Sequence, residues 1–410
     1  MRKSEDVVIL MKQNFDNIQM LFPSTVPDWN VWSTKRGLEP FAEEVIGFLS
    51  LLSKSILKDP ISRSFSDVVT FAFFCRKANL QKQKVKWNLQ EMRLGRGIIF
   101  HIAPSNVPIN FAYSFVAGLL SGNSNVVRVS SKVFPQVDLV VKHITSVAEK
   151  FPEICKRVVL VRYELVSRAT ELFSSFCDAR VIWGEDATIA EIRRNPIPAH
   201  AFDVTFSDRY SFAAINADSI LECADLPKLA EYFYNDTYLF DQNACTSPHL
   251  IVWLGKNEIV ATAKKLFWHE VAEVVRKKYT HQTVLALGKL ATFYRQSVTC
   301  DMKKEPVDDN RLWRTELKNL PKNIDEFRCI GGYFSEYNAK NLDEVFSIIT
   351  SKYQTLAVYG IPAETLENFV LRNRPCGIDR IVPFNETTDF SLVWDGYDLI
   401  RTLSRVVRIL

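Results

Sequence analysis

The feature that most constrains the fold is an alternation of short β-branched runs with helix-length amphipathic segments, which begins at Gly97. The first series of runs covers 98–102, 125–129, 157–162, 179–183 and 202–206. A second series predicts strands at 249–254, about 329–335 and 355–360, with helices at about 226–240, 257–279 and about 342–351. Strands that alternate with helices are typical of a mainly parallel sheet whose two faces are covered. The sequence therefore predicts an α/β protein with two parallel-sheet domains that join near residue 240.

The boundaries of these domains follow from the two series. Residues 1–90 carry apolar residues at helical spacing, which predicts a helical N-terminal segment packed on the first α/β domain. We expect residues 91–240 to form that domain, residues 241–375 to form the second, and residues 376–410 to complete the fold. The charged stretch 299–323, which contains two prolines, predicts a surface insertion between elements.

Composition excludes several classes of protein. The chain has 51 Lys and Arg against 47 Asp and Glu, a net charge of +4 that is spread along the sequence, so no basic face predicts a nucleic-acid partner. The eight cysteines show no CxxC spacing, which fits a reduced cytoplasm better than a disulfide framework. Lys12 and Asp16 interrupt the N-terminal apolar stretch, and no segment reaches the roughly 18 apolar residues of a membrane helix. We expect a cytoplasmic protein that binds no nucleic acid and does not span a membrane.

The commonest nucleotide-binding and hydrolase motifs are absent from the sequence. It contains no GxxxxGK[ST] loop, no GxSxG elbow and no GxGxxG that opens a helix, and only 14 glycines in all. His269 and Glu270 begin like a zinc-protease helix, but Glu273 stands where the second histidine is needed. The six histidines are dispersed, so we expect no metal site.

The loop after the run 98–102 holds the first candidate site residue, Asn106. Its sequence, APSNVP (103–108), places a proline on each side of Asn106, and each proline fixes the local backbone. Such a loop lies at the carboxyl edge of a parallel sheet, where α/β proteins bind ligands, and a fixed carboxamide suits an oxyanion hole. The simpler alternative, which this segment alone leaves open, is a turn before a helix.

A second polar loop, DQNACTSP (241–248), holds Cys245. A nucleophilic thiol needs partial exposure and polar neighbours, whereas structural cysteines lie in apolar runs, as Cys75 does in FAFFC. Of the eight cysteines, Cys245 alone has that setting, so it is the candidate nucleophile. The group that deprotonates it stays open, with His249 and His101 as candidates.

Together and in this order, these segments resemble the aldehyde dehydrogenase superfamily and, more narrowly, the fatty acyl-CoA reductases of the bacterial luminescence type. The blocks that carry the resemblance are HIAPSNVPINFAYS, GLLSGNSNVVRVSSK, DQNACTSP, CGIDRIVPF and WDGYDLIRTLSR. The resemblance implies an aldehyde dehydrogenase-like fold, in which residues 91–240 bind the dinucleotide and residues 241–375 carry the nucleophile. By it, Asn106 takes the place of the oxyanion-hole asparagine and Cys245 that of the nucleophile. It also implies a homo-oligomer, in which residues 403–410 either join subunits or finish the cofactor domain.

The resemblance places the cofactor at the segment NVVRVSSK, with Ser207 as a further contact. Arg128 falls where the family usually has a lysine, and Ser131 falls where it usually has a glutamate that accepts from the ribose. A glutamate repels a 2′-phosphate, whereas Ser130, Ser131, Arg128 and Lys132 offer hydroxyl donors and positive charge. We therefore expect NADPH rather than NADH as the cofactor.

A second departure from the family concerns water. Members that oxidise aldehydes carry a glutamate in an ELGGK block that activates the hydrolytic water, and this block is absent here. Glu222 lies in the 38-residue interval between Ser207 and Cys245 but outside any such motif. The expected activity is therefore the NADPH-dependent reduction of an acyl-CoA, foremost a fatty acyl-CoA, to the aldehyde through a thioacyl Cys245. The alternatives are an acyl phosphate, an acyl chain delivered by a partner protein, and a non-reducing acyl-binding scaffold.

Overall fold

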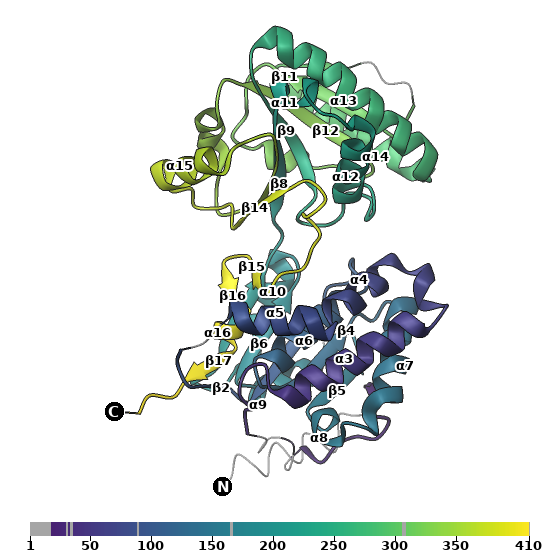
Figure 1. Ribbon diagram of the computed structural model, residues 1–410, viewed down its shortest axis with the longest axis vertical. Helices are drawn as coiled ribbons and strands as arrows, with labels where there is room; N and C mark the ends of the chain where they lie inside the picture. The colour runs from purple at the N-terminus through teal and green to yellow at the C-terminus, as the bar shows by residue number, and fades with distance from the viewer. Residues whose placement is uncertain are drawn as a thin grey trace. The chain divides into compact units, whose positions relative to one another are not determined.

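The computed structural model describes residues 18–29, 32, 36–87, 90–164, 167–305 and 309–409. The chain forms two compact units, one up to Ser207 and again from Leu392, the other over Asp208–Ser391. Each unit is built on its own sheet of mainly parallel strands with helices packed on it (Figure 1). The predicted α/β class with two parallel-sheet domains is confirmed.

The first unit holds a six-stranded sheet in the order β1-β5-β4-β3-β6-β7. Its strands are β1 (Gln19–Phe22), β3 (Ile98–Ile102), β4 (Ser124–Val129), β5 (Val158–Arg162), β6 (Ala179–Trp183) and β7 (Phe202–Phe206). All neighbours pair in parallel except β1 with β5. Every residue of β3 and β6 is buried, which explains why IIFHI and ARVIW are apolar except at His101 and Arg180 and do not alternate between apolar and polar residues.

The strand order of this sheet reverses beside β3. The chain passes from β3 to β4 and β5 on one side, and then returns to β6 and β7 on the other side. In open α/β sheets, ligands bind outside the carboxyl ends of the strands at such a switch point. The loop that follows β3 therefore lies at the edge where a ligand is expected.

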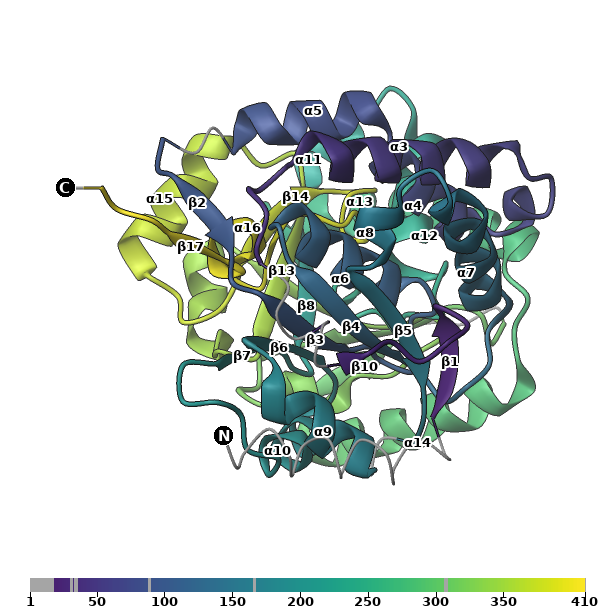
Figure 2. The same ribbon diagram turned by 90° about the horizontal axis from the view of Figure 1, so that it is seen from below.

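Helices cover both faces of the first sheet, with α3, α6 and α7 on one side and α9 and α10 on the other (Figure 2). The helices of this unit are α3 (Glu43–Lys58), η2 (Ser62–Ser64), α4 (Ser66–Phe74), α5 (Lys77–Lys86), α6 (Asn110–Leu120), α7 (Pro135–Ala148), α8 (Pro152–Cys155), α9 (Arg168–Phe176) and α10 (Asp186–Arg193). The predicted helical segment thus appears as α3, α4 and α5, and it also contributes strand β1. Residues 1–17 of that segment lie outside the described residues.

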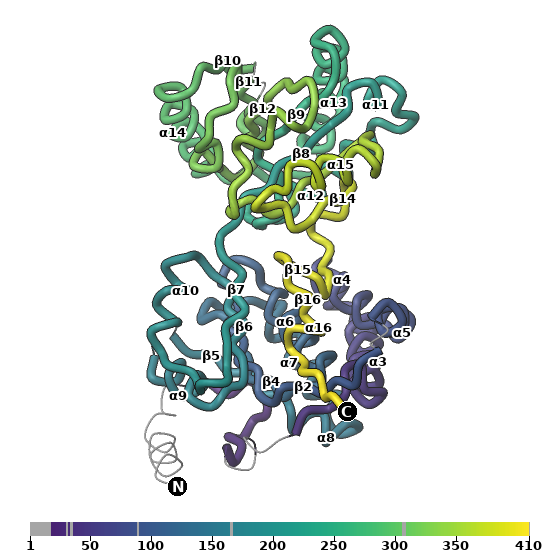
Figure 3. Tube along the Cα trace, turned by 90° about the vertical axis from the view of Figure 1, so that its left-hand side faces the viewer, coloured from purple at the N-terminus to yellow at the C-terminus, as the bar shows by residue number. Residues whose placement is uncertain are grey.

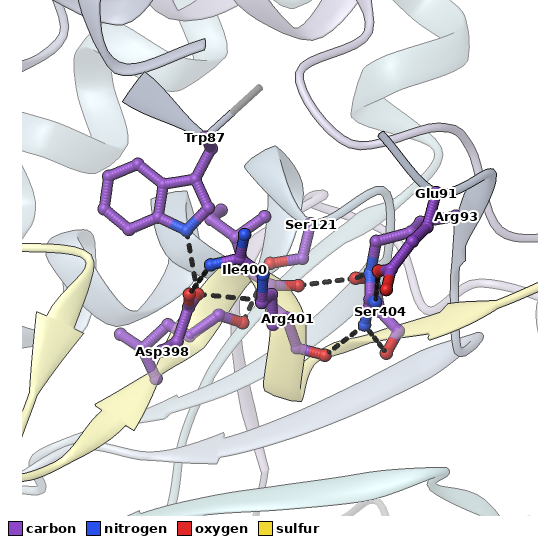
Figure 4. A network of polar contacts seen from close by, with 9 residues as sticks. Trp87, Glu91, Arg93, Ser121, Asp398, Ile400, Arg401 and Ser404 are labelled. Carbon is purple, nitrogen blue, oxygen red and sulfur yellow. Dashed lines mark hydrogen bonds and ion pairs between the residues drawn. The ribbon is translucent and has the colours of Figure 1, made fainter. Parts of the chain in front are cut away.

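The C-terminal segment returns to the first unit, where it lies along α6 (Figure 3). Its elements are β15 (Val393–Trp394), β16 (Tyr397–Asp398), α16 (Leu399–Thr402) and β17 (Ser404–Val406), and β17 pairs antiparallel with β2 (Arg93–Gly95). Figure 4 shows the polar contacts that hold it, among them Trp87 Nε1 donating to Asp398 Oδ1 at 2.8 Å and Arg93 donating to the Arg401 carbonyl at 2.7 Å. Residues 404–406 therefore pair within their own chain.

The second unit holds a seven-stranded sheet in the order β10-β11-β12-β9-β8-β13-β14, parallel except for β10 with β11. Its strands are β8 (Tyr210–Asn216), β9 (Pro248–Leu254), β10 (Met302–Lys304), β11 (Trp313–Leu317), β12 (Tyr333–Ala339), β13 (Tyr353–Tyr359) and β14 (Arg380–Pro383). Its helices are α11 (Ala217–Leu221), α12 (Leu226–Thr237), α13 (Asn257–Lys278), α14 (Thr283–Thr299), η3 (Ile324–Phe327), η4 (Leu342–Ile348) and α15 (Ala363–Asn373). One apolar core joins α11, α12 and α13 to one face, and a second joins η3, η4 and α15 to the other (Figure 1).

The units divide the chain at other residues than the sequence predicts. Residues 208–240 were expected in the first α/β domain, yet β8 pairs with β9 and β13, and α12 packs on α13. The segment 204–211 resembles one strand, but β7 ends at Phe206 and β8 begins at Tyr210, so the chain changes sheets between them. Residues 376–410 are likewise divided, because β14 belongs to the second sheet.

The surface insertion predicted at 299–323 is wrong. Met302–Lys304 and Trp313–Leu317 form β10 and β11, which extend the second sheet at one edge. The prediction failed because Met302–Lys304 carries two lysines, as an exposed edge strand does, and so lacks an apolar run. The strand predicted at about 329–335 begins at Tyr333 and continues to Ala339.

Candidate active site

Asn106 stands in the turn between β3 and α6, and its side chain is exposed. The turn is fixed at both ends, since the Ala103 N–H donates to the Arg128 carbonyl at 3.0 Å and the Asn110 N–H donates to the Val107 carbonyl at 3.2 Å. The first of these bonds joins the exit of β3 to the adjacent strand β4. Asn106 thus presents a carboxamide from a fixed turn at the carboxyl edge of the first sheet.

The residues expected to bind the cofactor at NVVRVSSK lie together at this same edge, where β4 ends. Arg128 is 6% exposed, and its Nε donates to the Tyr163 carbonyl at 3.2 Å while its guanidinium lies 5.5 Å from the centre of the Tyr163 ring. Burial lowers the pKa of Arg128 below its ordinary value. Ser130 is buried and its Oγ accepts from the Lys132 N–H at 3.1 Å, while Ser131 is half-buried and Lys132 is exposed. The end of β4 therefore presents the guanidinium of Arg128, which a hydrogen bond keeps in place, together with serine hydroxyl groups and the ammonium group of Lys132.

Ser207 lies apart from this group. It follows β7, whose place in the sheet is three strands from β4, or about 14 Å at the usual strand spacing. The turn Gly184–Asp186 is nearer, because it follows β6 at the switch point. Sequence reasoning missed this turn, although the run ARVIW followed by GED marks it. Its carboxylates accept bonds from hydroxyl groups but repel phosphates, so they suit a ribose rather than a phosphate group.

Cys245 lies at the amino edge of the second sheet, in the turn between α12 and the start of β9. The residue is half-buried. Ser211 Oγ on β8 donates to the Cys245 carbonyl at 2.6 Å and accepts from the Thr355 N–H at 3.2 Å. Ser247 Oγ donates to the Asp236 carbonyl at 2.8 Å. Hydrogen bonds thus fix the loop at Cys245, through its carbonyl, and at Ser247, through its side chain.

Gln242 fixes the start of the same loop. It is 1% exposed, and its Nε2 donates to the carbonyls of Pro248 and Tyr333 at 3.0 and 3.2 Å. Its Oε1 accepts from the N–H groups of Gly332 and Tyr333 at 2.9 and 3.2 Å. Asp241 and Gln242 have φ angles of 51° and 62°, and this costly conformation of two successive non-glycine residues is offset by the four bonds. Sequence reasoning missed Gln242, since two of its three partners, Gly332 and Tyr333, are about ninety residues away along the chain.

The two candidate bases for Cys245 are both buried. His101 is fully buried, with Nδ1 2.7 Å from Ser114 Oγ and Nε2 2.9 Å from Asn125 Oδ1, and burial lowers its pKa to about 4. His249 stacks on Tyr210 at 5.8 Å between ring centres, and burial lowers its pKa to about 3. A general base needs a pKa near the working pH. These imidazoles therefore suit packing and hydrogen bonding better than proton transfer at neutral pH.

The low pKa of His101 predicts a loss of stability in acid. The unfolded chain binds this proton at its ordinary pKa of 6.5 and the folded chain only near 4, so stability is full above about pH 6.5 and falls as the pH drops toward 4. The full effect is about 3 kcal/mol. Urea unfolding between pH 7 and pH 4 measures it, and His101→Gln should flatten the dependence by this amount. An unchanged slope in the variant would contradict the assignment.

The remaining cysteines have other surroundings. Burial raises the pKa of Cys75, that of Cys155 to about 11 and that of Cys177 to about 12, so these thiols stay protonated near neutral pH. Cys376 is exposed in the turn after α15. The structure joins none of the eight cysteines by a disulfide.

Within the described ranges, no three His, Cys, Asp or Glu side chains gather in a way that could hold a metal ion. Over the same part of the chain, no helix is both long and apolar enough to cross a bilayer.

The two parallel-sheet units, between which the chain crosses twice, form an aldehyde dehydrogenase-like fold that solved structures share. Proline utilization A of Bradyrhizobium japonicum, in its D778Y mutant, is 16% identical with a TM-score of 0.63, over 96% of this chain and 44% of that one. Lactaldehyde dehydrogenase of Escherichia coli is 11% identical with a TM-score of 0.61, over 92% and 87% of the two chains. A putative aldehyde dehydrogenase of Burkholderia cenocepacia is 12% identical with a TM-score of 0.62, over 96% and 86%. The expected fold is confirmed.

The chain belongs to the acyl-CoA reductase (LuxC) family, whose model matches residues 63–409. It is also similar to a curated protein of Vibrio harveyi, described as a long-chain acyl-protein thioester reductase. The two are 24% identical over an alignment of 320 residues, and the match covers 76% of this chain. The matched region spans 63% of the length of that relative. The resemblance inferred from the sequence is confirmed at the level of the family.

Proposed function

We propose that this protein reduces an acyl thioester to the aldehyde with NADPH, and that Cys245 carries the acyl group between the two half-reactions. The observation that carries the proposal is the Cys245 loop, in which Cys245 is half-buried and bonds from Ser211 and Ser247 to backbone carbonyls fix the chain just before β9. Membership of the acyl-CoA reductase family supports the choice of substrate class.

The first half-reaction is acyl transfer. The Cys245 thiolate attacks the thioester carbonyl, the C–S bond to the donor breaks, and the donor leaves as a thiolate, which then takes up the proton that the Cys245 thiol has given up. Asn106 Nδ2 and the Cys245 N–H are proposed to donate to the oxygen as it gains negative charge. Because a thiolate is a good leaving group, this step needs no strong general acid.

In the second half-reaction the acyl group on Cys245 is reduced. NADPH, when bound, would supply the hydride that this reduction needs. The chain's part is to hold the thioester and its oxygen in place with the same donors, and to release the Cys245 sulfur as a thiolate when the aldehyde forms. This cycle restores the free enzyme without hydrolysis.

The position of Glu222 supports reduction over oxidation to an acid. Glu222 follows α11, beyond the carboxyl end of β8, whereas Cys245 lies at the amino edge of the same sheet next to Ser211. The seven residues of β8 separate these two edges by roughly 20 Å. Glu222 is thus poorly placed to activate a water molecule at Cys245.

The β4 exit fits NADPH. The Arg128 guanidinium is oriented by its bond to the Tyr163 carbonyl, and its terminal NH2 groups suit a 2′-phosphate. Ser130, Ser131 and Lys132 supply hydroxyl groups and a second cation at the same place. We propose that these residues bind the adenosine end of the cofactor, with Ser207 as a more distant contact.

Ser131→Glu is expected to reverse the choice of cofactor. A carboxylate beside the 2′-phosphate removes a charge-assisted contact worth about 1.5–3 kcal/mol, so kcat/KM with NADPH should fall about 10- to 100-fold, while NADH is favoured. Steady-state kinetics with both cofactors measures the ratio, and Lys142→Ala, an exposed cation on α7 of the same unit, is the control. If the wild type uses NADH as well as or better than NADPH, the assignment fails.

Two substrates are candidates, and they differ in the molecule that carries the acyl group. Acyl-CoA is favoured by the family description, and an acyl chain carried by a partner protein is favoured by the description of the Vibrio harveyi relative. We propose acyl-CoA as the first candidate. Enzyme supplied with NADPH and long-chain acyl-CoA should form aldehyde, which a hydrazone derivative detects. Turnover with an acyl protein alone would select the second candidate, and turnover with an acyl phosphate alone would reject both.

Two further properties belong to this proposal. A chain whose cysteines form no disulfide fits the cytoplasm, and the family resemblance implies a homo-oligomer.

A scaffold that only binds acyl groups should show no saturable quenching or enhancement of NADPH fluorescence. Such a result would reject the reductase.

A further inference from the structure

Asp236 is a buried carboxylate immediately before the Cys245 loop, in the last turn of α12. It is 1% exposed. Its Oδ2 accepts from the Asn385 N–H at 2.7 Å, and its Oδ1 accepts from the Thr387 N–H at 3.1 Å and from Thr387 Oγ1 at 2.7 Å. Its own carbonyl accepts from Ser247 Oγ at 2.8 Å. One residue therefore binds both a distant turn and the loop that carries Cys245.

The distant turn, residues 383–389, begins at the end of the block CGIDRIVPF (376–384), to which the proposed function gives no role. Arg380 on β14 donates to the carbonyls of Glu386, Thr387 and Asp389 at 3.0–3.1 Å. Asn235 Nδ2 donates to Asn385 Oδ1 at 2.7 Å, and Asn385 has a φ of 75°. The bonds from Arg380 thus fix the conformation of the turn, and the bond from Asn235 attaches α12 to it.

Phe384, at the start of this turn, anchors it in the apolar core of the unit. Its ring lies 5.6 Å from that of Phe233 on α12 and 6.5 Å from that of Phe267 on α13, between ring centres. The turn is therefore held by packing as well as by polar contacts.

The burial of an ionised carboxylate costs free energy, so Asp236 is an unfavourable residue with which to hold a turn. Burial raises its pKa to about 6 in spite of the three donors, and the charge of Asp389 adds to the rise. A neutral side chain would avoid this cost, but only a carboxylate offers acceptors on both oxygens to three donors. The bonds of Asp236 to both segments point to a role beyond the stability of the turn.

We propose that Asp236 is a positioning residue for Cys245, which fixes the nucleophile loop by tying α12 to the turn 383–389 and the loop to α12. This inference rests on the proposed role of Cys245 as the nucleophile. Protonation of the carboxyl group places an O–H against N–H donors, so the attachment weakens below about pH 6. Asp389 and Glu386 in the turn and Arg380 on β14 are the charged groups at this place.

Asp236→Asn and Thr387→Val test the proposal, with Glu336→Gln as the control. Glu336 is a fully buried carboxylate of the same unit that accepts from Trp253, Trp268 and Arg314, away from the loop. Hydrogen exchange of the amides at 243–247 should quicken about 10-fold in the first two variants and stay unchanged in the control. The rate of acylation of Cys245 should fall about 10-fold, while KM for NADPH is unaltered.

The pH profile separates positioning from simple stability. In the wild type, the acylation rate should fall below about pH 6, and Asp236→Asn should remove this limb. Unchanged exchange at 243–247 in both variants, or equal changes in Glu336→Gln, would overturn the proposal. Exchange is measured without substrate, so its outcome stands apart from the proposed function, which fails instead if Cys245→Ala still acylates.

Discussion

Replacement of Cys245 by alanine is expected to lower aldehyde formation by on the order of 10⁴-fold, since no other group takes the acyl chain. The fold should be kept, because hydrogen bonds at the Cys245 carbonyl and at Ser247 hold the loop. Aldehyde formation at saturating acyl-CoA and NADPH measures the loss.

The matched control is Cys376→Ala, which removes an exposed thiol from the same unit. Its activity should equal that of the wild type. A Cys245→Ala enzyme that keeps more than a tenth of the wild-type rate would show that the acyl group travels by another route.

Asn106→Ala is expected to slow acylation by about 10²–10³-fold, the usual cost of one lost oxyanion donor. The Asn106 side chain is exposed and the turn is fixed through backbone bonds of its neighbours, so the thermal midpoint should not change. Rapid mixing with acyl-CoA in the absence of NADPH measures the acylation rate directly.

Ser105→Ala is the control for Asn106, because Ser105 is an exposed polar residue in the same turn. It should acylate at the wild-type rate. Equal loss in both variants would assign the effect to the turn, and no loss in Asn106→Ala would leave the oxyanion without this donor.

The sequence predicts the buried strands well for a physical reason. The runs 98–102 and 179–183 coincide with β3 and β6, because parallel strands covered on both faces consist mainly of apolar residues, and the run 202–206 coincides with the edge strand β7. The two candidate loops were also found locally, since prolines and polar residues interrupt those runs. What a local pattern shows is where an element lies, and little about what it pairs with.

The parts that the sequence did not predict depend on distant partners. The strand-like segment 204–211 contains the passage between two sheets, which only strand pairing shows. Gln242 and Asp236 are ordinary polar residues until the turns at 332–333 and 385–387 meet them. His101 looked like a candidate base beside the Asn106 loop, but Ser114 and Asn125 enclose it.

The two sheets present their candidate residues at different edges. Asn106 and the β4 exit follow the rule that α/β ligands bind at the carboxyl ends of strands. Cys245 precedes β9, so it stands at the amino ends of β8 and β9 in its own sheet. This rule alone would therefore not have located the candidate nucleophile in the second sheet.

Intact-protein mass spectrometry after incubation with acyl-CoAs of different length, without NADPH, tests the central claim most directly. We expect one acyl group per chain, located on the peptide that contains Cys245. This group should be absent in Cys245→Ala and should be released as aldehyde when NADPH is added. A protein that stays unmodified with every acyl-CoA and acyl protein offered, or an acyl group on another residue that NADPH releases as aldehyde, would contradict it.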